Sequence, residues 1–388
     1  MRVWCDPEID ASFFLSVAAV LVGAGVATWR RRRRGVDARR LNVGDAAVAV
    51  GAAVAVLLVE VAVTGVGGFF GLAALGSRVL FGVGPTAVLV TGLVNRRAGA
   101  TRSARTAVGL AAAAIVLGTY GTHVEPFWLR VDQLDVPVAT AGDRPVRIGV
   151  LADIQTDAAG PHERDAVRAV LDADPDIVLV AGDLFQGDDE AFAREGPAIR
   201  DLLREVRAPH GAFVVEGDVD RYDRLEWLLD GTGLQRLDDE VVVVDVDGQR
   251  VRIGGNRIRW DTSDAAAMRA ELASAPDDDL VILLAHRPDA VLDLPPGSAV
   301  DLTVAGHTHG GQVVIPGFGP PVTFTDVPRH VARGGLHDVG GNLLYVSSGV
   351  GVERAGAPRL RLFSRPSVGI LDLVSANPDG PSRTRSPG

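Results

Sequence analysis

Long apolar runs fill the first third of the chain. Residues 11–29 contain no charged side chain, and similar stretches run from about 46 to 66, from about 69 to 94 and from about 106 to 120. A helix of about 20 apolar residues crosses the hydrocarbon core of a bilayer. The pattern therefore predicts a transmembrane region of about four helices within residues 1–122.

Clusters of arginine lie in two of the loops between these runs. Arg30–Arg34 follow the first run, and Arg96, Arg97, Arg102 and Arg105 follow the third. Because positive side chains favour the cytoplasmic face, both loops are expected inside the cell. An even number of spans then returns the chain to the outside. We expect a multi-pass plasma-membrane protein whose remaining residues form an extracytoplasmic domain in contact with membrane lipids.

From about residue 145 the pattern changes to short runs rich in Val, Ile and Leu, each ending in Asp or His. These runs are residues 146–153, 176–183, 211–218, 280–286 and 301–307. Each is typical of a buried strand, and amphipathic segments near 162–171 and 191–206 predict helices between the first strands. Open α/β sheets place their sites at the carboxyl ends of strands, where these polar side chains fall.

Later runs predict a second set of strands joined by Gly, Asn and Pro turns. These runs are residues 241–246, 251–255, 311–316, 342–349, 360–364 and 368–373, and we expect them to be antiparallel. The predicted fold is α/β, with two packed mixed sheets flanked by helices and preceded by an all-α transmembrane bundle. We assign residues 123–144 to a linker, 145–374 to the α/β domain and 375–388 to a disordered, Pro-rich tail.

Charge divides the chain near the same place. Residues 1–130 hold 14 Arg and 7 acidic side chains, and the whole chain carries −10, so residues 131–388 carry −17. A domain with this field repels polyanions, and no nucleic-acid partner is expected. Cys5 is the only cysteine, which excludes an intrachain disulfide and a cysteine-based zinc site.

Seven side chains at or just after the strand ends can carry chemistry. They supply three carboxylates, one amide and three imidazoles, from Asp153, Gln155, Asp183, Asp218, His286, His307 and His309. Taken singly, an Asp at a strand end often caps a helix and a lone His often packs in a core. Together they would crowd charge unless cations held them, and mixed N and O donors suit Mn, Fe or Zn.

This ordered set resembles the calcineurin-like metallophosphoesterase family, whose pattern runs DxH, GDxxD, GNH followed by D or E, a lone His, and GHxH. The resemblance covers roughly residues 145–374, and GHTHGGQ at 306–312 is its most specific element. The stretch YVSSGVGVERAGAPRLRLFSRP at 345–366 is similar to the membrane-anchored branch of the family. The resemblance implies an αββα sandwich and a metal-dependent phosphoesterase.

Carried onto this chain, the resemblance implies two divalent metal ions, which are Mn, Fe, Zn or Mg. The first ion would be held by Asp153, Gln155, Asp183 and His309, and the second by Asp183, Asp218, His286 and His307. Such a pair can clamp a phosphate oxygen and activate hydroxide for in-line attack on a phosphomonoester or phosphodiester. We assign catalytic roles to Asp183, His307 and Asp220. The tether to the membrane makes a lipid-linked phosphoester one candidate substrate.

Three motifs depart from the family pattern. Gln155 replaces the His of DxH, Gln186 replaces the second Asp of GDxxD, and Asp218–Val219 replace the Asn–His pair. An amide oxygen is a weaker ligand than imidazole for Zn or Fe and favours harder ions such as Mn or Mg. Asp218 keeps an oxygen ligand and adds a negative charge. A filled metal site is compatible with both changes.

The change to Val219 affects the expected rate of catalysis. In the family the imidazole lost there assists the leaving group, and general acid catalysis commonly contributes ~10²–10⁴-fold in rate. Asp220, Arg221 and His162 are candidates for a replacement proton donor or phosphate contact. The alternative hypothesis is a degenerate domain that binds metal or a phosphorylated ligand as a sensor or assembly partner. A gain of activity on Val219→His would separate the two hypotheses.

Overall fold

The computed structural model describes residues 33, 51, 68–94, 102–258, 262–354 and 356–376. The chain divides into two compact units. The helical unit comprises Met1–Val124 and Arg354–Arg359, and the sheet unit comprises Glu125–Glu353 and Leu360–Gly388. The first two predicted spans and the tail from residue 377 lie outside the described residues.

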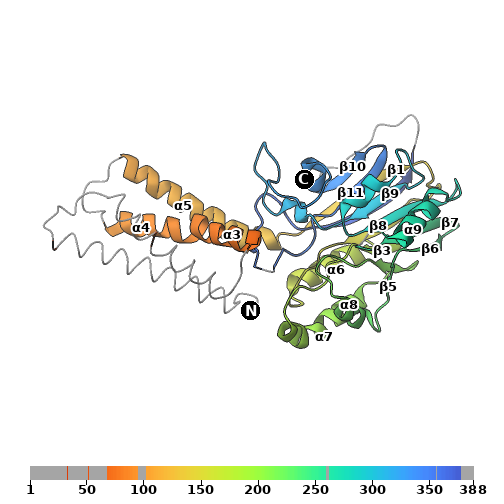
Figure 1. Cartoon of the computed structure of the whole chain (residues 1–388), viewed down its shortest axis with the longest axis horizontal. Coiled ribbons are helices and arrows are strands. Elements are labelled where there is room, and N and C mark those ends of the chain that lie inside the picture. Colours follow the sequence, from red (N-terminus) through yellow and green to blue (C-terminus); the bar gives the residue numbers. More distant parts are fainter. Residues whose placement is uncertain are drawn as a thin grey trace. The chain divides into compact units, whose positions relative to one another are not determined.

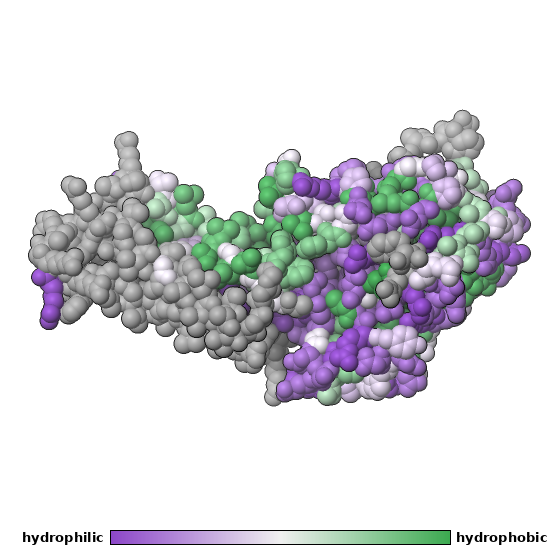
Figure 2. Space-filling view, viewed as in Figure 1, coloured by the Kyte–Doolittle hydropathy of each residue, from purple (hydrophilic) through white to green (hydrophobic). Residues whose placement is uncertain are grey.

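The described part of the helical unit consists of apolar helices. They are α3 (Gly68–Ser77), the π-helical η1 (Arg78–Val83), α4 (Gly84–Val94) and α5 (Arg102–His123). Two stretches, Phe69–Leu89 and Arg105–Phe127, are long and apolar enough to cross a membrane. They coincide with the third and fourth predicted spans, and most of their surface in Figure 2 is coloured as hydrophobic. Length and composition alone identify them as candidate spans.

The sheet unit contains two six-stranded mixed sheets (Figure 1). The first has the order β1-β12-β2-β3-β4-β5, formed by β1 (Arg130–Val138), β2 (Val146–Leu151), β3 (Ile177–Val180), β4 (Ala212–Val214), β5 (Leu234–Arg236) and β12 (Ser367–Ser375). The second has the order β10-β11-β9-β8-β7-β6, formed by β6 (Glu240–Val246), β7 (Gln249–Asn256), β8 (Leu280–Ala285), β9 (Leu302–Ala305), β10 (Gly335–Val339) and β11 (Asn342–Val346). Two mixed sheets were predicted, and this part of the prediction is confirmed.

Helices cover the outer faces of the two sheets. They are α6 (Pro161–Leu171), α7 (Asp189–Glu205), α8 (Tyr222–Leu229), α9 (Ser263–Ala273) and α10 (Arg329–Ala332), with short 3-10 turns η3 (Glu125–Phe127), η4 (Pro288–Asp293) and η5 (His309–Gly311). Helix α6 contacts β2 and β12, α8 contacts α7 and β5, and α9 contacts β6 and β7. Figure 1 shows α8 between α7 and β5, and α9 beside β6.

Three apolar clusters correspond to the three interfaces between these layers. One joins inward-facing side chains of both sheets, including Ile148 of β2 and Ile282 of β8, which are fully buried. The second lies between the first sheet and α6 to α8, and the third lies between the second sheet, α9 and η4. The central strands are buried on both faces, which explains why they are continuous apolar runs in the sequence.

The assigned linker of residues 123–144 is not free chain. Residues 130–138 form β1, which pairs in parallel with β12 from Arg130↔Ser367 to Val138↔Ser375. β1 lies at a sheet edge, and its charged residues and Pro137 are typical of edge strands, which a search for apolar runs passes over. The linker assignment was therefore wrong over these residues.

Two of the later predicted strands are not strands. Residues 311–316 and 360–364 meet only through the isolated parallel bridge Val313↔Leu362. Gly and Pro residues interrupt the first segment and prevent a regular ladder. The expected antiparallel pairing is also only partly right, because β11 pairs antiparallel with β10 but parallel with β9.

Candidate functional site

The predicted site residues lie in the segments that follow five strands of the sheet unit. Asp153 and Gln155 follow β2, Asp183 follows β3, Asp218 follows β4, His286 follows β8, His307 follows β9, and His309 begins η5. The two sheets thus present them at the carboxyl ends of parallel strands, as the sequence predicted.

Five of these residues have a left-handed backbone. The φ angles are 46° at Asp153, 36° at Gln155, 56° at Asp183, 70° at His307 and 48° at His309. Non-glycine residues rarely adopt this conformation, which costs of order 1–3 kcal/mol and persists where the surroundings impose it. The turns that carry these side chains are therefore bent sharply at the ligand positions themselves.

His286 lies at the centre of the site. Its Nδ1 lies 2.7 Å from the backbone oxygen of Ala181 and donates to it. Its Nε2 lies 3.4 Å from Asp183 Oδ2 and 3.5 Å from Asp218 Oδ2. A backbone acceptor on one ring nitrogen fixes the tautomer and leaves the other nitrogen as a ligand.

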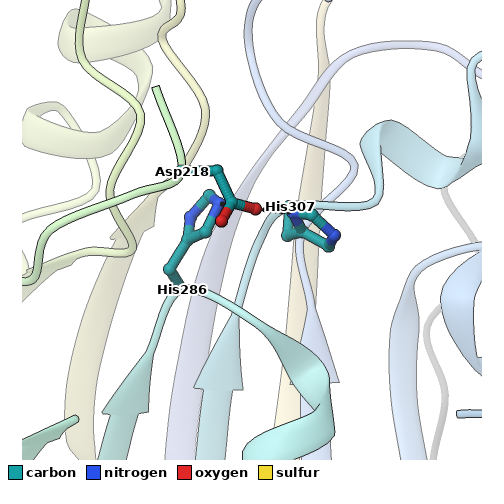
Figure 3. A group of neighbouring side chains, drawn as sticks. All are labelled: Asp218, His286 and His307. Atoms are coloured by element: carbon teal, nitrogen blue, oxygen red, sulfur yellow. Dashed lines mark ion pairs between the residues drawn. The ribbon is translucent and has the colours of Figure 1, made fainter. Parts of the chain in front are cut away.

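Two groups of possible metal ligands share His286. In the first, Asp218, His286 and His307 each offer one atom within 4.8 Å of the others, and these side chains point toward one another in Figure 3. His307 Nδ1 lies 2.7 Å from Asp218 Oδ2. In the second group, His286 is joined by Asp153 and Asp183 under the same limit. His309, a predicted ligand that the structure also describes, belongs to neither group.

Several ligand atoms at these positions are buried without a conventional partner. Among the described residues, Asp153 Oδ2, His286 Nε2 and His309 Nδ1 are buried and accept or donate no hydrogen bond. Leaving such an atom unsatisfied costs about 1–3 kcal/mol, and more when it is charged. Three such atoms at predicted ligand positions fit divalent metal ions, which use oxygen and imidazole donors of this kind.

The site shifts the pKa values of its own groups. Burial raises the pKa of Asp183 to about 6, against the opposing effect of His286. Burial lowers the pKa of His286, but Asp183, Asp218 and Asp153 outweigh it and raise that pKa to about 10. Burial and the nearby Arg361 hold the pKa of His309 well below its usual value, so its imidazole is neutral at pH 7.

Asp220 binds the backbone of two loops that carry predicted metal ligands. Its Oδ2 accepts hydrogen bonds from the backbone N of Asp183 at 2.8 Å and of Gly217 at 2.9 Å, and its Oδ1 accepts from Leu184 N at 2.9 Å. The carboxylate therefore ties the loop after β3 to the loop after β4. These bonds support a positioning role and do not favour the proton donor that the sequence analysis assigned.

The other candidate proton donors are engaged elsewhere. The Nε2 of His162 lies 3.0 Å from the backbone oxygen of Val350. Arg221 donates to Asp189, the first residue of α7, and to Asp223 in the first turn of α8. In these contacts neither side chain meets a predicted metal ligand, as a replacement for the imidazole missing at position 219 would.

Two arginines at the site were missed by the sequence analysis. Arg287 donates to Asp218, with Nη2 2.8 Å from Oδ1, and so faces the extra negative charge of that position. Arg361 is fully buried and donates to backbone carbonyls of His309, Ser348, Gly349, Gly351 and Ser364. An arginine inside the apolar run LRLF was the one available signal for the second.

Comparison with known proteins gives a family for this arrangement. Residues 146–311 match the family model described as calcineurin-like phosphoesterase. The matched segment carries every one of the predicted metal ligands. These findings support membership in the calcineurin-like metallophosphoesterase family. Members of this family are metal-dependent phosphoester hydrolases.

Curated relatives extend this calcineurin-like likeness beyond the matched segment. The chain is 27% identical over 263 residues to the phosphodiesterase YaeI of Escherichia coli, covering 66% of this chain and 92% of that protein. It is 28% identical over 276 residues to an uncharacterized metallophosphoesterase of Aquifex aeolicus, covering 67% and 97%. It is 27% identical over 225 residues to the metallophosphoesterase YkuE of Bacillus subtilis, covering 55% and 73%.

Proposed function

We propose that the protein is a membrane-anchored, metal-dependent phosphoesterase that hydrolyses a phosphomonoester or phosphodiester. The observation that carries this proposal is the pair of ligand groups that share His286, together with the buried, unsatisfied ligand atoms among them. The family likeness of residues 146–311 supports the same reaction class.

The residues divide the work between holding metal and holding one another. Asp153 and Asp183 would hold one divalent ion, and Asp218, His286 and His307 would hold the second. When bound, such ions polarise a phosphoryl oxygen and lower the pKa of water. The backbone oxygen of Ala181 binds His286 and so holds the loop after β8 against the loop after β3. The carboxylate of Asp220 ties the loop after β3 to the loop after β4.

Metal content and hydrolysis test this proposal together. The full-length protein in detergent is expected to hold about two metal ions per chain and to release nitrophenol from aryl phosphoesters with added Mn²⁺. Asp183→Ala is expected to lose the metal and the activity. Asp165→Ala, on the exposed face of α6, is the matched control and is expected to keep both. A wild-type protein without metal and without turnover would contradict the proposal.

A second candidate is a degenerate domain that binds metal or a phosphorylated ligand as a sensor or assembly partner. Val219 favours it, because the candidate donors His162 and Arg221 are engaged elsewhere. Val219→His distinguishes the two functions. A gain of turnover of ~10²-fold or more would identify a reaction centre that lacks only its acid. A stable metal load with no turnover in either form would favour the binding protein.

A lipid-linked substrate is part of the proposal and is supported by an apolar rim on the sheet unit. We define the apolar rim as Phe127, Trp128, Ile315, Phe318 and Phe363, whose side chains are 46% to 56% exposed. Exposed aromatic side chains of this kind are typical of membrane–water interfaces. Figure 2 shows hydrophobic patches on a surface of the sheet unit that is otherwise mainly hydrophilic.

Hydrogen bonds join the three segments of the apolar rim. Val314 N donates to Leu362 O at 2.8 Å, and Glu125 accepts from the backbone N of Phe363 at 2.9 Å. The candidate span Arg105–Phe127 ends in the apolar rim itself, so the chain leads from a possible membrane helix directly into it. A substrate phosphate carried by a lipid would be presented at such a surface.

A further inference from the structure

Three polar side chains form a closed hydrogen-bonded cluster beside the predicted first metal position. Gln155 Nε2 donates to Gln186 Oε1 at 3.0 Å and to Glu353 Oε2 at 3.1 Å. Gln186 Nε2 donates to Glu353 Oε1 at 2.8 Å. We call these three residues the amide–carboxylate cluster. They come from the segments after β2, β3 and β11, which are far apart in the sequence.

The cluster joins two departures from the family pattern that lie 31 positions apart in the sequence. Gln155 stands where the pattern has His, and Gln186 stands where it has Asp. In the structure both amides bind the same carboxylate, Glu353. That carboxylate supplies a negative charge next to the position from which the Asp of GDxxD has been lost.

The cluster also fixes which way the Gln155 amide is turned. Both partners of its Nε2 are oxygen atoms, so the amide nitrogen must point to them. The amide oxygen is then directed to the other side of a side chain that is fully buried. The backbone N of Gln155 donates to Asp183 O at 2.7 Å, which fixes this residue relative to a predicted metal ligand.

Glu353 is itself anchored to the most specific family motif. Its backbone N donates to Oε1 of Gln312, the last residue of GHTHGGQ, at 3.0 Å. The backbone of Glu353 is therefore fixed on one side of the cluster. The turns after β2 and β3 fix Gln155 and Gln186 on the other side. A network in which every member is bonded holds its side chains in one arrangement.

We propose that Glu353 and Gln186 are positioning residues that hold the amide oxygen of Gln155 toward the ion bound by Asp153 and Asp183. An amide oxygen in place of imidazole makes this position select Mn²⁺ or Mg²⁺ over Zn²⁺. The inference rests on the proposed function, because it requires that the site bind metal. It adds Glu353, a residue outside the family's metal motifs, as the group that sets the selectivity.

The test is metal binding by the full-length protein in detergent after removal of metal with a chelator. Free Mn²⁺ is followed by its electron paramagnetic resonance signal, and Zn²⁺ is followed by competition. Glu353→Ala is expected to weaken one of two Mn²⁺ sites by ~10–100-fold, as loss of outer-shell partners does, and to lower the Mn²⁺ to Zn²⁺ preference. Glu353→Asp is expected to recover part of the affinity. Gln155→His is expected to shift the preference toward Zn²⁺.

Controls separate this inference from the proposed function. Glu226→Ala makes the same change on the exposed face of α8 and is expected to bind like wild type. Should Glu353→Ala fail to fold, Gln186→Met removes the other hydrogen bond of Gln155 Nε2, together with the bond between Gln186 and Glu353, and decides the question. Wild-type binding of two ions with unchanged affinity and preference in the folded variants would overturn the inference alone. A wild-type protein that binds no metal would overturn the proposed function as well.

Discussion

Gly217 stands where the loop after β4 passes against Asp183. A Cβ at this position would overlap both Oδ1 and the backbone N of Asp183. Gly217→Ala is therefore expected to displace this ligand and to lower metal affinity at least ~10-fold, as misplacement of a ligand's support does. Metal retained after dialysis measures the effect. Gly233→Ala is the matched control, because the nearest atom to its added Cβ is Val206 O at 3.9 Å.

Two titrating groups at the site make metal binding depend on pH. Because the pKa of Asp183 is raised to about 6, the apparent metal affinity is expected to fall as the pH is lowered from 7.5 to 5.5. Because the pKa of His286 is raised to about 10, this imidazole carries a proton at pH 7.5 and must release it to become a ligand. Calorimetric titration in buffers of different ionisation enthalpy counts the protons released, and a pH-independent affinity without proton release would contradict this view.

The same pKa values contribute to the pH dependence of the stability of the metal-free protein. The raised pKa of Asp183 stabilises the fold below the usual carboxyl pKa, and this contribution is lost as the pH rises through about 6. The raised pKa of His286 acts in the same direction but is lost only as the pH rises through about 10. These two groups therefore favour the metal-free fold at mildly acidic pH.

At the scale of elements, Arg361 holds together the irregular segments around η5. Its buried guanidinium donates to five backbone carbonyls, of which those of His309 and Gly349 also accept from a backbone N–H. Arg361→Met would leave several buried carbonyls unsatisfied at about 1–3 kcal/mol each, and we expect a loss of about 3 kcal/mol or more in the free energy of unfolding. Denaturant titration measures it. Arg168→Met, on the exposed face of α6, is expected to change stability by less than about 0.5 kcal/mol.

The elements that the sequence predicts best bury either a continuous apolar run or one whole apolar face. The five strands that end in Asp or His, and helices α6 and α7, show their burial directly as apolar runs and amphipathic periods. Strand β1 was missed because an edge strand carries charge, and β5 and β10 were missed because they are short or contain few buried residues. A hydropathy pattern along the sequence reveals an element through the apolar side chains that it buries, and these three strands bury few.

The residues of the site also divide into those that the sequence could predict and those that it could not. The metal-ligand positions could be predicted because each follows a strong strand in a motif of fixed spacing. Arg287, Arg361 and Glu353 could not be predicted, because their roles arise from contacts across the fold. Glu353 lies 198 positions from Gln155, and no local pattern links the two.

For the whole molecule, the apolar rim predicts contact with the bilayer. In a Cys5→Ser background, an environment-sensitive fluorophore on Phe318→Cys or Phe363→Cys is expected to shift to shorter wavelength in lipid nanodiscs and to be quenched by spin-labelled lipid. Tyr222→Cys is the control, because Tyr222 is as exposed as Phe318, at 56%, but lies on α8 outside the apolar rim. Equal quenching at all three positions would contradict the assignment.

A functional readout complements the fluorescence. Phe318→Ser is expected to reduce hydrolysis of a phosphoester embedded in vesicles while leaving hydrolysis of a soluble aryl phosphoester unchanged. Protection of the apolar rim by self-association would instead appear as a change in oligomeric mass with no response to lipid. Reduced hydrolysis of both substrates would place the effect in the metal site and not in the apolar rim.

Glu125 determines where the protein can be cut. It is buried, and its two carboxylate oxygens accept the backbone N–H groups of Phe363 at 2.9 Å and Ser364 at 2.6 Å. The sequence predicted that the α/β domain begins only at residue 145, but a protease cut or a truncation between Glu125 and that residue would strip two buried donors of their acceptor, at about 1–3 kcal/mol each. The last residues before β1 therefore belong to the sheet unit, and we expect that unit to keep its stability only when the chain is cut on the amino-terminal side of Glu125.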